Sequence, residues 1–334
     1  MGKTRTAVIG AGKMGAIHAK VYYQLPESQL VAVVDLDKAK AQKLARKYKC
    51  QAFDSCEQLI GQVDAVTIAA PTDSHLPLAK LFIENHIPVM IEKPLAVNAE
   101  QAGEIVAAAK ENNTLAAVGH SERCNPVVRA MKRLNIEPKF IESTRISPYP
   151  FRSTDIGVVM DVMIHDIDII LSLAASKVQK IDAVGVNVIA EHEDICNARI
   201  VFESGCIANV TASRLALKTE RKVRVFSREA YLSLDYLKKT GTVIKAKPNV
   251  DVVEWIRKRQ KAGNFSFAGL SWPDLLHIKR LDIDEKEPLR VEQQAFLRAV
   301  ADKTTRPEVS AEEGLAAIQC AEEILDSIKK HKWD

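Results

Sequence analysis

The sequence predicts an α/β fold: a doubly wound parallel sheet, followed by a second α/β domain built on a large, mostly antiparallel, open sheet. In the first 122 residues, short runs that are apolar throughout, such as "TAVIG", "LVAVVDLD" and "PVMIEKP", alternate with helical patterns. Such runs are typical of parallel strands covered on both faces. Beyond residue 154, long segments alternate β-branched and polar residues without helices between them, which indicates antiparallel strands.

The elements of the first half follow one another as strand and helix. We expect "TAVIG" to lead into a helix that begins within "GAGKMGAIHA", and the later strands to be followed by "KAKAQKLARKYK", "LPLAKLFIENH" and "AEQAGEIVAAAKENN". Asn98 is positioned as the N-cap of the last of these helices, with Gln101 three residues on. We place the domain boundary at residue 122, giving domains 1–122 and 123–334.

The second half begins with an apolar helix, "IGVVMDVMIHDIDIILSLAA", after a polar, proline-rich stretch. The strands "NARIVFESGCIANVTAS" contain "ESG", which predicts a hairpin turn. Two helices close the chain, "RVEQQAFLRAVAD" and "AEEGLAAIQCAEEILDSIKK", and a return of these helices onto the first domain remains open.

Composition restricts the partners. The 334 residues carry 47 basic and 43 acidic side chains, a net charge of +4, which is too weak a field to indicate nucleic acid. No apolar run reaches the length of a membrane span and a strand begins at once, so we expect no membrane partner and a cytoplasmic protein. The six cysteines form no CxxC pair, which predicts a reduced compartment and no metal site.

The turn "GAGKMG" carries the first chemical motif, with Gly10, Gly12 and Gly15 enclosing Lys13 and Met14. It lies between a strand and a helix, and Asp35 ends the next strand twenty residues after the last glycine. This context predicts a dinucleotide-binding Rossmann turn, in which glycines admit a pyrophosphate to a helix N-terminus. Asp35 favours NAD over NADP because its carboxylate accepts from ribose hydroxyls and repels a 2′-phosphate. The nearby Lys38 keeps NADP open as the alternative.

Polar residues follow two more strands at the same predicted edge. In "AAPTDSH", we expect Pro71, Thr72 and His75 to pass along the cofactor, the alternative being a strand-to-helix turn with a capping hydroxyl. In "VMIEKP", Glu92 and Lys93 end an apolar strand directly before a proline. Either Lys93 is a solvated charge, or it assists proton transfer and polarises a substrate hydroxyl beside the cofactor.

The helix motif "DVMIHDID" places charges on an otherwise apolar helix. Asp161 and His165 are four residues apart and share a face with Asp168, whereas Asp166 points elsewhere. Charges on such a helix are costly unless they are paired or face a pocket. The pattern therefore indicates either a structural Asp–His bond or a general base whose tautomer is fixed by its neighbour.

In order and spacing, "GAGKMG…D…PTDSH…EKP…DVMIHDID" resembles the Gfo/Idh/MocA (glucose-fructose oxidoreductase/inositol dehydrogenase) family over nearly the whole chain. The resemblance implies a Rossmann domain, NAD as cofactor, and a C-terminal α/β domain that often builds dimers or tetramers through its sheet. It also implies that Lys93, Asp161 and His165 are the catalytic residues of a sugar or polyol dehydrogenase. A cis bond before Pro94 belongs to the same pattern.

"GHSERCNPVVRAMKRL" and "STRISPYPFRSTDIGVVMDVMIHDIDII" resemble the branch that oxidises UDP-N-acetylglucosamine at C3, although Cys124 replaces the usual aromatic residue. Guanidinium groups suit a diphosphate, so Arg123, Arg145 and Arg152 are candidate substrate ligands. Asn125 either holds a sugar hydroxyl or caps the next helix. The alternatives are an inositol or other polyol dehydrogenase, and a regulator that binds NAD without turnover.

Overall fold

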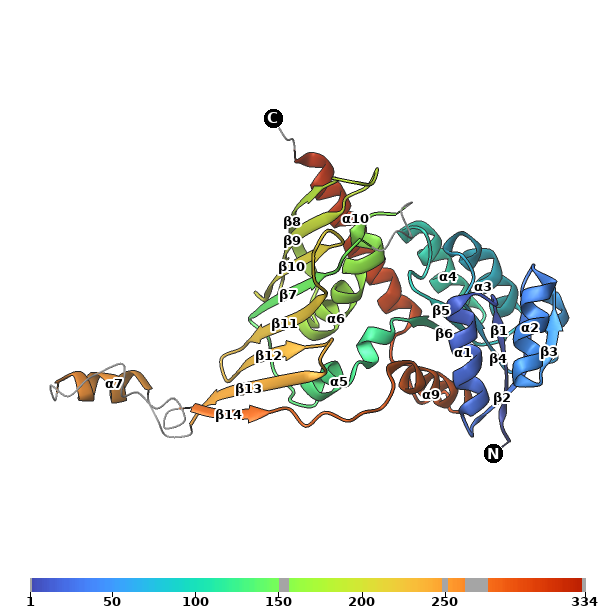
Figure 1. Cartoon of the computed structure of the whole chain (residues 1–334), viewed down its shortest axis with the longest axis horizontal. Helices are drawn as coiled ribbons and strands as arrows, with labels where there is room; N and C mark the ends of the chain where they lie inside the picture. Colours follow the sequence, from blue (N-terminus) through green and yellow to red (C-terminus); the bar gives the residue numbers. More distant parts are fainter. Residues whose placement is uncertain (1, 150–155, 248–251, 262–275, 332–334) are drawn as a thin grey trace.

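The chain forms two sheets with helices between and around them (Figure 1). The structure is a computed structural model that describes residues 2–149, 156–247, 252–261 and 276–331. The six-stranded sheet lies at the N-terminal end of the colour gradient and the eight-stranded sheet lies on the opposite side of the molecule. This arrangement is the predicted fold class, with a parallel sheet followed by a mostly antiparallel one.

The six-stranded sheet is parallel throughout and has the strand order β3-β2-β1-β4-β5-β6. Its strands are β1 (Thr4–Ile9), β2 (Ser28–Val34), β3 (Gln51–Phe53), β4 (Ala65–Ile68), β5 (Val89–Glu92) and β6 (Ala116–Gly119). Its helices are α1 (Lys13–Gln24), α2 (Lys38–Tyr48), α3 (His75–Glu84) and α4 (Ala99–Glu111). The order reverses between β1 and β4, and ligands of such sheets bind at the carboxyl ends of strands beside this point.

Local sequence explains these elements. All four residues of the central strand β4 and all four of the edge strand β6 are buried, as expected for parallel strands covered on both faces. Asn98 caps α4, because its side chain accepts a hydrogen bond of 2.9 Å from the backbone N–H of Gln101. Lys49, directly after α2, adopts a left-handed conformation with φ of 54° that ends the helix.

The eight-stranded sheet has the order β14-β13-β12-β11-β7-β10-β9-β8, and every pair is antiparallel except β7 with β10. Its strands are β7 (Phe140–Ile146), β8 (Val178–Val186), β9 (Ile195–Phe202), β10 (Ile207–Ser213), β11 (Glu220–Phe226), β12 (Tyr231–Asp235), β13 (Thr240–Ala246) and β14 (Leu276–Arg280). The "ESG" turn joins β9 to β10 with Gly205 at φ of 78°, which confirms the predicted hairpin.

One face of this sheet is covered and the other is open. In β9, Cys196, Ala198 and Ile200 are fully buried, whereas the alternate residues Asn197 and Arg199 are exposed. The helices beside the covered face are α5 (Pro126–Lys132) and α6 (Ile164–Ala174), which lie between this sheet and the first one (Figure 1). The alternation of β-branched and polar residues in the sequence is the signature of this single covered face.

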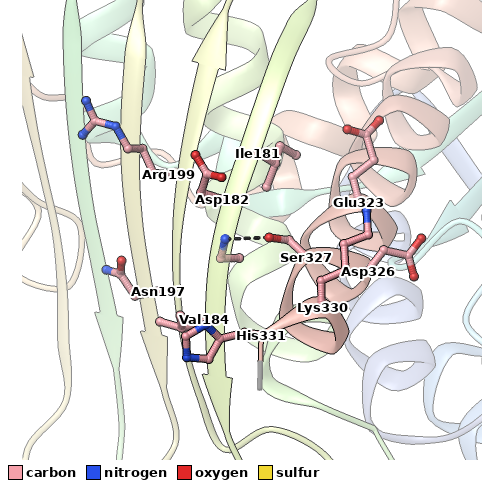
Figure 2. Close-up of a pocket in the computed structure, with 11 residues that line it drawn as sticks. Ile181, Asp182, Val184, Asn197, Arg199, Glu323, Asp326, Ser327, Lys330 and His331 are labelled. Carbon is pink, nitrogen blue, oxygen red and sulfur yellow. Dashed lines mark hydrogen bonds between the residues drawn. The ribbon is translucent and has the colours of Figure 1, made fainter. Parts of the chain in front are cut away.

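The closing helices connect the two halves. In α9 (Pro288–Ala301), Leu289 and Leu297 belong to the same buried cluster as Val8 and Tyr22 of the first sheet and its helix. The long α10 (Ala311–Lys330) runs beside the edge strand β8, where the backbone N–H of Ala183 donates to Ser327 Oγ at 2.8 Å (Figure 2). A helix in this position protects a strand edge from pairing with other chains.

The remaining described helix, α7 (Val252–Lys261), extends away from the sheets beyond β13 (Figure 1). Within the described ranges, no helix has the length and apolar character that crossing a membrane requires.

Candidate active site

The glycine turn between β1 and α1 can only be built from glycines at two of its positions. Gly10 has φ of 96°, and a Cβ there would lie 2.4 Å from the carbonyl oxygen of Ala69. A Cβ on Gly15 would lie 1.7 Å from the carbonyl oxygen of Gly10. At Gly12, by contrast, nothing lies within 4 Å of an added Cβ. The first and third glycines close the turn, and the second leaves its outer side open.

That open side fits a dinucleotide pyrophosphate. Gly12 is the N-cap residue of α1 and has no side chain to satisfy the N–H groups of the first turn. Lys13 and Met14, the first residues of the helix, are exposed. Free N–H groups and the helix dipole favour an anion at this position.

Asp35 is held beside the glycine turn by two backbone hydrogen bonds. Its Oδ2 accepts from the N–H of Ala11 at 2.7 Å and its Oδ1 accepts from the N–H of Asp37 at 2.8 Å. Lys38 forms an ion pair with Asp54 at 2.6 Å, so this cation already has a carboxylate partner. Leu36 is 94% exposed at the same strand end, a position that sequence patterning did not single out. The carboxylate is therefore fixed at the end of β2, directly beside the glycine turn.

The segment after β4 begins with an exposed residue, Pro71, and ends with a buried one, His75. Pro71 is exposed and Thr72 begins a short 3-10 turn, but neither Thr72 nor Ser74 caps α3 with its side chain. His75 is buried, and its ring nitrogens lie 3.0 Å from the carbonyl oxygens of Ala70 and Pro94. Burial lowers its pKa from the ordinary value. His75 thus joins the tip of β4 to the turn after β5.

Lys93 leaves the tip of β5 toward the helix motif of the second domain. The bond between Lys93 and Pro94 is cis, as the family resemblance implies. Lys93 Nζ donates to the backbone carbonyl of Asp161 at 2.8 Å and lies 3.2 Å from its Oδ1. Both side chains are mostly buried, with 19% and 26% of their surfaces exposed. The lysine is therefore a positioned group and not a freely solvated charge.

Glu92 does not point freely into the crevice. Its Oε2 accepts from the backbone N–H of Lys93 at 3.2 Å, and its Oε1 lies 2.6 Å from Nε2 of His18 on α1. Burial alone raises the pKa of Glu92, but the hydrogen bonds and positive charges of His18 and Lys93 together outweigh it and leave the pKa below its ordinary value. Glu92 is thus an ionised carboxylate at the strand tip.

The motif that carries Asp161 and His165 begins with a π-helical turn, Val159–Met163, and continues as α6 from Ile164. The sequence predicted one regular helix here, and a single wide turn of this kind is typical of functional sites. Asp161 bonds to Lys93, and no hydrogen bond joins it to His165 among the described residues. Both alternatives predicted from the sequence joined the aspartate to the histidine, and the structure shows a bond between Asp161 and Lys93 in place of that pairing.

His165 is suited to accept a proton. Burial lowers its pKa well below the ordinary 6.5, and the positive charges of Lys93 and Arg145 lower it further. Its Nδ1 is buried and has no hydrogen-bond partner in the part of the chain that the structure describes. The imidazole is therefore neutral at neutral pH, with a lone pair available for a proton.

His120, at the end of β6, is a site residue that sequence reasoning missed. Its ring meets that of His165 edge to face, with centroids 6.3 Å apart. It is fully buried, and burial lowers its pKa. "GHSERCNP" contained it, but one histidine after a buried strand gave no signal of this contact, since its partner lies 45 residues away.

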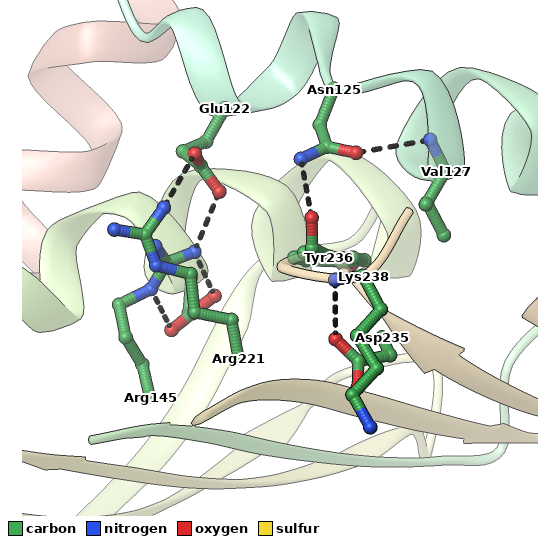
Figure 3. A network of polar contacts seen from close by, with 9 residues as sticks. Glu122, Asn125, Val127, Arg145, Arg221, Asp235, Tyr236 and Lys238 are labelled. Atoms are coloured by element: carbon green, nitrogen blue, oxygen red, sulfur yellow. Dashed lines mark hydrogen bonds and ion pairs between the residues drawn. The ribbon is translucent and has the colours of Figure 1, made fainter. Parts of the chain in front are cut away.

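Two of the predicted substrate arginines form buried ion pairs instead. Arg145 donates to both carboxylate oxygens of Asp166 at 2.8 and 2.9 Å. It also donates to Glu122 at 3.1 Å (Figure 3). Arg123 donates through Nε to Asp168 at 2.8 Å, through a second nitrogen to the same carboxylate, and to Glu313 at 2.7 Å. Their donors are used in anchoring α6, so neither is carried further as a phosphate ligand.

The other predicted substrate residues have different outcomes. Asn125 caps α5, since its Oδ1 accepts from the N–H of Val127 at 3.0 Å, and its amide donates to the carbonyl of Tyr236 at 3.4 Å (Figure 3). Arg152 lies outside the described residues. Arg221 of β11 was not predicted, yet it is 40% exposed and shares Glu122 with Arg145 (Figure 3). Within the part of the chain that the structure describes, its side-chain hydrogen bond uses Nη1 alone, which leaves guanidinium donors beside the site available.

A strand-tip lysine, a neutral histidine and an open glycine turn define a dinucleotide-dependent oxidoreductase, which confirms the predicted class. No cluster of three or more metal-binding side chains occurs among the described residues. Comparison with known proteins makes the class specific. Residues 4–120 match the oxidoreductase family with the NAD-binding Rossmann fold, and residues 141–233 match the GFO/IDH/MocA C-terminal domain. The chain belongs to the Gfo/Idh/MocA family, and NAD is its cofactor.

Individual relatives agree with this assignment. The chain is 35% identical over 237 residues to the UDP-N-acetylglucosamine 3-dehydrogenase of Acidithiobacillus ferrooxidans, covering 71% of this chain and 75% of that protein. The solved structure of that enzyme superposes with a TM-score of 0.86 at 28% identity and covers 98% of this chain and 99% of the other. An inositol 2-dehydrogenase of Rubrobacter xylanophilus is 32% identical over 54% of this chain and 55% of that protein.

Proposed function

We propose that the protein oxidises a sugar hydroxyl to a ketone, with NAD as hydride acceptor. The observation that carries this proposal is the convergence of Lys93, Asp161 and His165 from two separate domains. Lys93 at the tip of β5 is held on Asp161, and the neutral imidazole of His165, 72 residues later in sequence, lies near enough for the lysine charge to lower its pKa. Proton removal and charge stabilisation on one oxygen need this pair of groups.

In the proposed mechanism, His165 takes the proton of the hydroxyl as the C–H bond of the same carbon gives up hydride. NAD supplies the hydride acceptor when it is bound. Lys93 donates a hydrogen bond to the oxygen and stabilises the negative charge that develops there, while Asp161 holds the ammonium in place. The carbon is oxidised to a ketone, and the proton remains on the imidazole until solvent removes it.

We assign the cofactor to the edge of the first sheet. Residues 1–122 bind NAD through Gly10, Gly12, Gly15 and Asp35, with Lys13, Met14, Pro71 and Thr72 along its path. Glu92 and His75 act by positioning the strand tips, because their hydrogen bonds end on neighbouring groups of the chain. Residues 123–334 bind the substrate and carry the contacts between subunits.

For the substrate we propose UDP-N-acetylglucosamine, oxidised at C3. Its support is the relative named for that reaction, which matches the chain over both domains at a higher identity than the inositol dehydrogenases do. The half-exposed Arg221 offers a guanidinium that a diphosphate can engage. An inositol or other polyol dehydrogenase is the second candidate, favoured by the same catalytic residues and the second relative.

The test is absorbance at 340 nm with NAD and either UDP-N-acetylglucosamine, myo-inositol or glucose, with 2-oxoglutarate added in parallel to reoxidise retained NADH. Reduction only with the nucleotide sugar supports the proposal, and reduction only with myo-inositol or glucose replaces the substrate while keeping the chemistry. No reduction with any of them, from a protein that carries NAD, favours a regulator. UDP alone should raise the melting temperature if the nucleotide binds the folded protein.

We also propose that the open sheet face forms a homodimer or homotetramer. Phe140, Phe226 and Tyr231 stack across three neighbouring strands on this face, with ring centroids 5.7 and 4.8 Å apart. An apolar cluster on an uncovered face is typical of a subunit interface. Light scattering gives the assembly mass, and Tyr231→Lys should lower it if this face is the contact.

A further inference from the structure

A chain of buried hydrogen bonds runs from α9 to the tip of β5. It begins at Gln293, passes through His18 of α1 and Glu92, and ends at the backbone of Lys93. Gln293 and His18 are fully buried, and the Glu92 side chain is 12% exposed. Neither Gln293 nor His18 has a part in the proposed chemistry, so that chemistry does not explain this series of hydrogen bonds.

The donor and the acceptor of the hydrogen bonds between Gln293 and His18 follow from the chemistry of the two groups in each contact. Gln293 Nε2 lies 3.3 Å from the backbone carbonyl oxygen of His18 and 2.9 Å from its Nδ1. A carbonyl oxygen only accepts, so the group that faces it must be the amide NH2. The same NH2 then donates to Nδ1, which makes Nδ1 an acceptor and leaves the imidazole proton on Nε2.

With its proton on Nε2, His18 donates to Oε1 of Glu92 at 2.6 Å. The second carboxylate oxygen accepts from the N–H of Lys93 at 3.2 Å. Gly119 of the next strand closes the other side, because a Cβ added there would lie 3.4 Å from Cδ and Oε1 of Glu92. The carboxylate is therefore held from three elements and fixes the backbone from which the lysine side chain starts.

We propose that Gln293 and His18 are positioning residues that set the direction of Lys93 through Glu92. This inference rests on the proposed function, in which Lys93 must reach one substrate oxygen. A displacement of about 1 Å at a reacting group can cost roughly 100-fold in rate. Loss of one of these hydrogen bonds should therefore lower kcat. Because Gln293 belongs to α9, these hydrogen bonds also link a helix of the C-terminal part of the sequence to the tip of β5.

The experiment compares His18→Phe, which keeps the ring and removes both nitrogens, with Gln293→Leu, which removes the amide donor. Both should lower kcat by about 10- to 100-fold while KM and the Kd for NAD stay within about threefold. His18→Gln, whose amide N–H can replace Nε2–H, should recover part of kcat. Gln294→Leu is the matched control, since the hydrogen bond of this neighbouring side chain among the described residues lies at the surface, to Glu27.

Two readouts decide the proposal without turnover. In a crystal structure of His18→Phe, Lys93 Nζ should leave the carbonyl of Asp161, from which it is 2.8 Å away in the native protein. In ¹⁵N-histidine spectra of the native protein, the resonance lost in His18→Phe should be that of an Nε2–H tautomer. An unmoved lysine, an Nδ1–H or doubly protonated His18, or losses of kcat that only follow falling stability would each overturn the proposal. Absence of sugar oxidation by the native protein would instead reject the proposed function.

Discussion

Removing the guanidinium of Arg123 should destabilise the protein and not merely weaken substrate binding. The side chains of Arg123 and Asp168 are 3% and 1% exposed, and Nε and a second guanidinium nitrogen bond the carboxylate. Arg123→Leu leaves a buried carboxylate without its counter-ion, which costs about 3–5 kcal/mol in comparable pairs. The lost contact to Glu313 adds little because that carboxylate is 36% exposed.

Urea unfolding followed by far-UV circular dichroism measures this cost, with the slope of the transition checked for constancy. Lys80→Leu is the control, since its pair with Glu104 is 37% and 44% exposed and should be worth below about 1 kcal/mol. Replacing both Arg123 and Asp168 by leucine should recover much of the loss. A loss no greater than that of the control, together with weaker binding of a UDP-sugar, would refute the structural role and restore Arg123 as a ligand.

Further outcomes are expected at the glycine turn, at Asp35 and at His165. Gly12→Ala should leave the fold intact and weaken NAD binding measured by calorimetry, whereas Gly15→Ala should destabilise the fold itself, because its Cβ would overlap the carbonyl of Gly10. Asp35→Ser should raise the affinity for NADP relative to NAD, since a carboxylate no longer repels the 2′-phosphate; an unchanged ratio would contradict its assignment. The acidic limb of kcat/KM should lie well below pH 6.5, because the pKa of His165 is lowered in the folded protein. Because of the same lowered pKa, the imidazole of His165 takes up a proton below about pH 6.5 in the unfolded chain but not in the folded protein. The free energy of unfolding should therefore fall by roughly 1 kcal/mol at pH 5.5 on account of this group. His165→Gln should abolish this part of the pH dependence.

The fold was readable from local patterns because its signals are local. Uniformly apolar runs marked the buried strands, and the spacing of Gly10, Gly12 and Gly15 marked a turn that closes only with glycine. Alternation along β9 marked a sheet with one covered face. The π-helical turn before His165 was not readable, since its sequence, "VMDVM", is equally compatible with an α-helix.

The site could be predicted only in part from the sequence. A charged residue at the end of a strand gives the same sequence pattern whether its partner is a ligand or a residue far away in the chain. Arg123 finds its partners 45 and 190 positions away, and Glu92 finds His18 at a separation of 74. The sequence next to these residues does not predict such long-range pairs. The family resemblance implied that Lys93 and Asp161 belong to one catalytic site, but it did not predict the hydrogen bonds between them, and the sequence around either residue gives no sign of that contact.

The most direct test of the proposed reaction uses UDP-N-acetylglucosamine deuterated at C3 in a single turnover with NAD. The NADH formed should carry the deuterium, the sugar product should be a 3-ketone, and Lys93→Met and His165→Gln should each suppress both. Unlabelled NADH, a ketone at another carbon, or an undiminished turnover in either variant would contradict it.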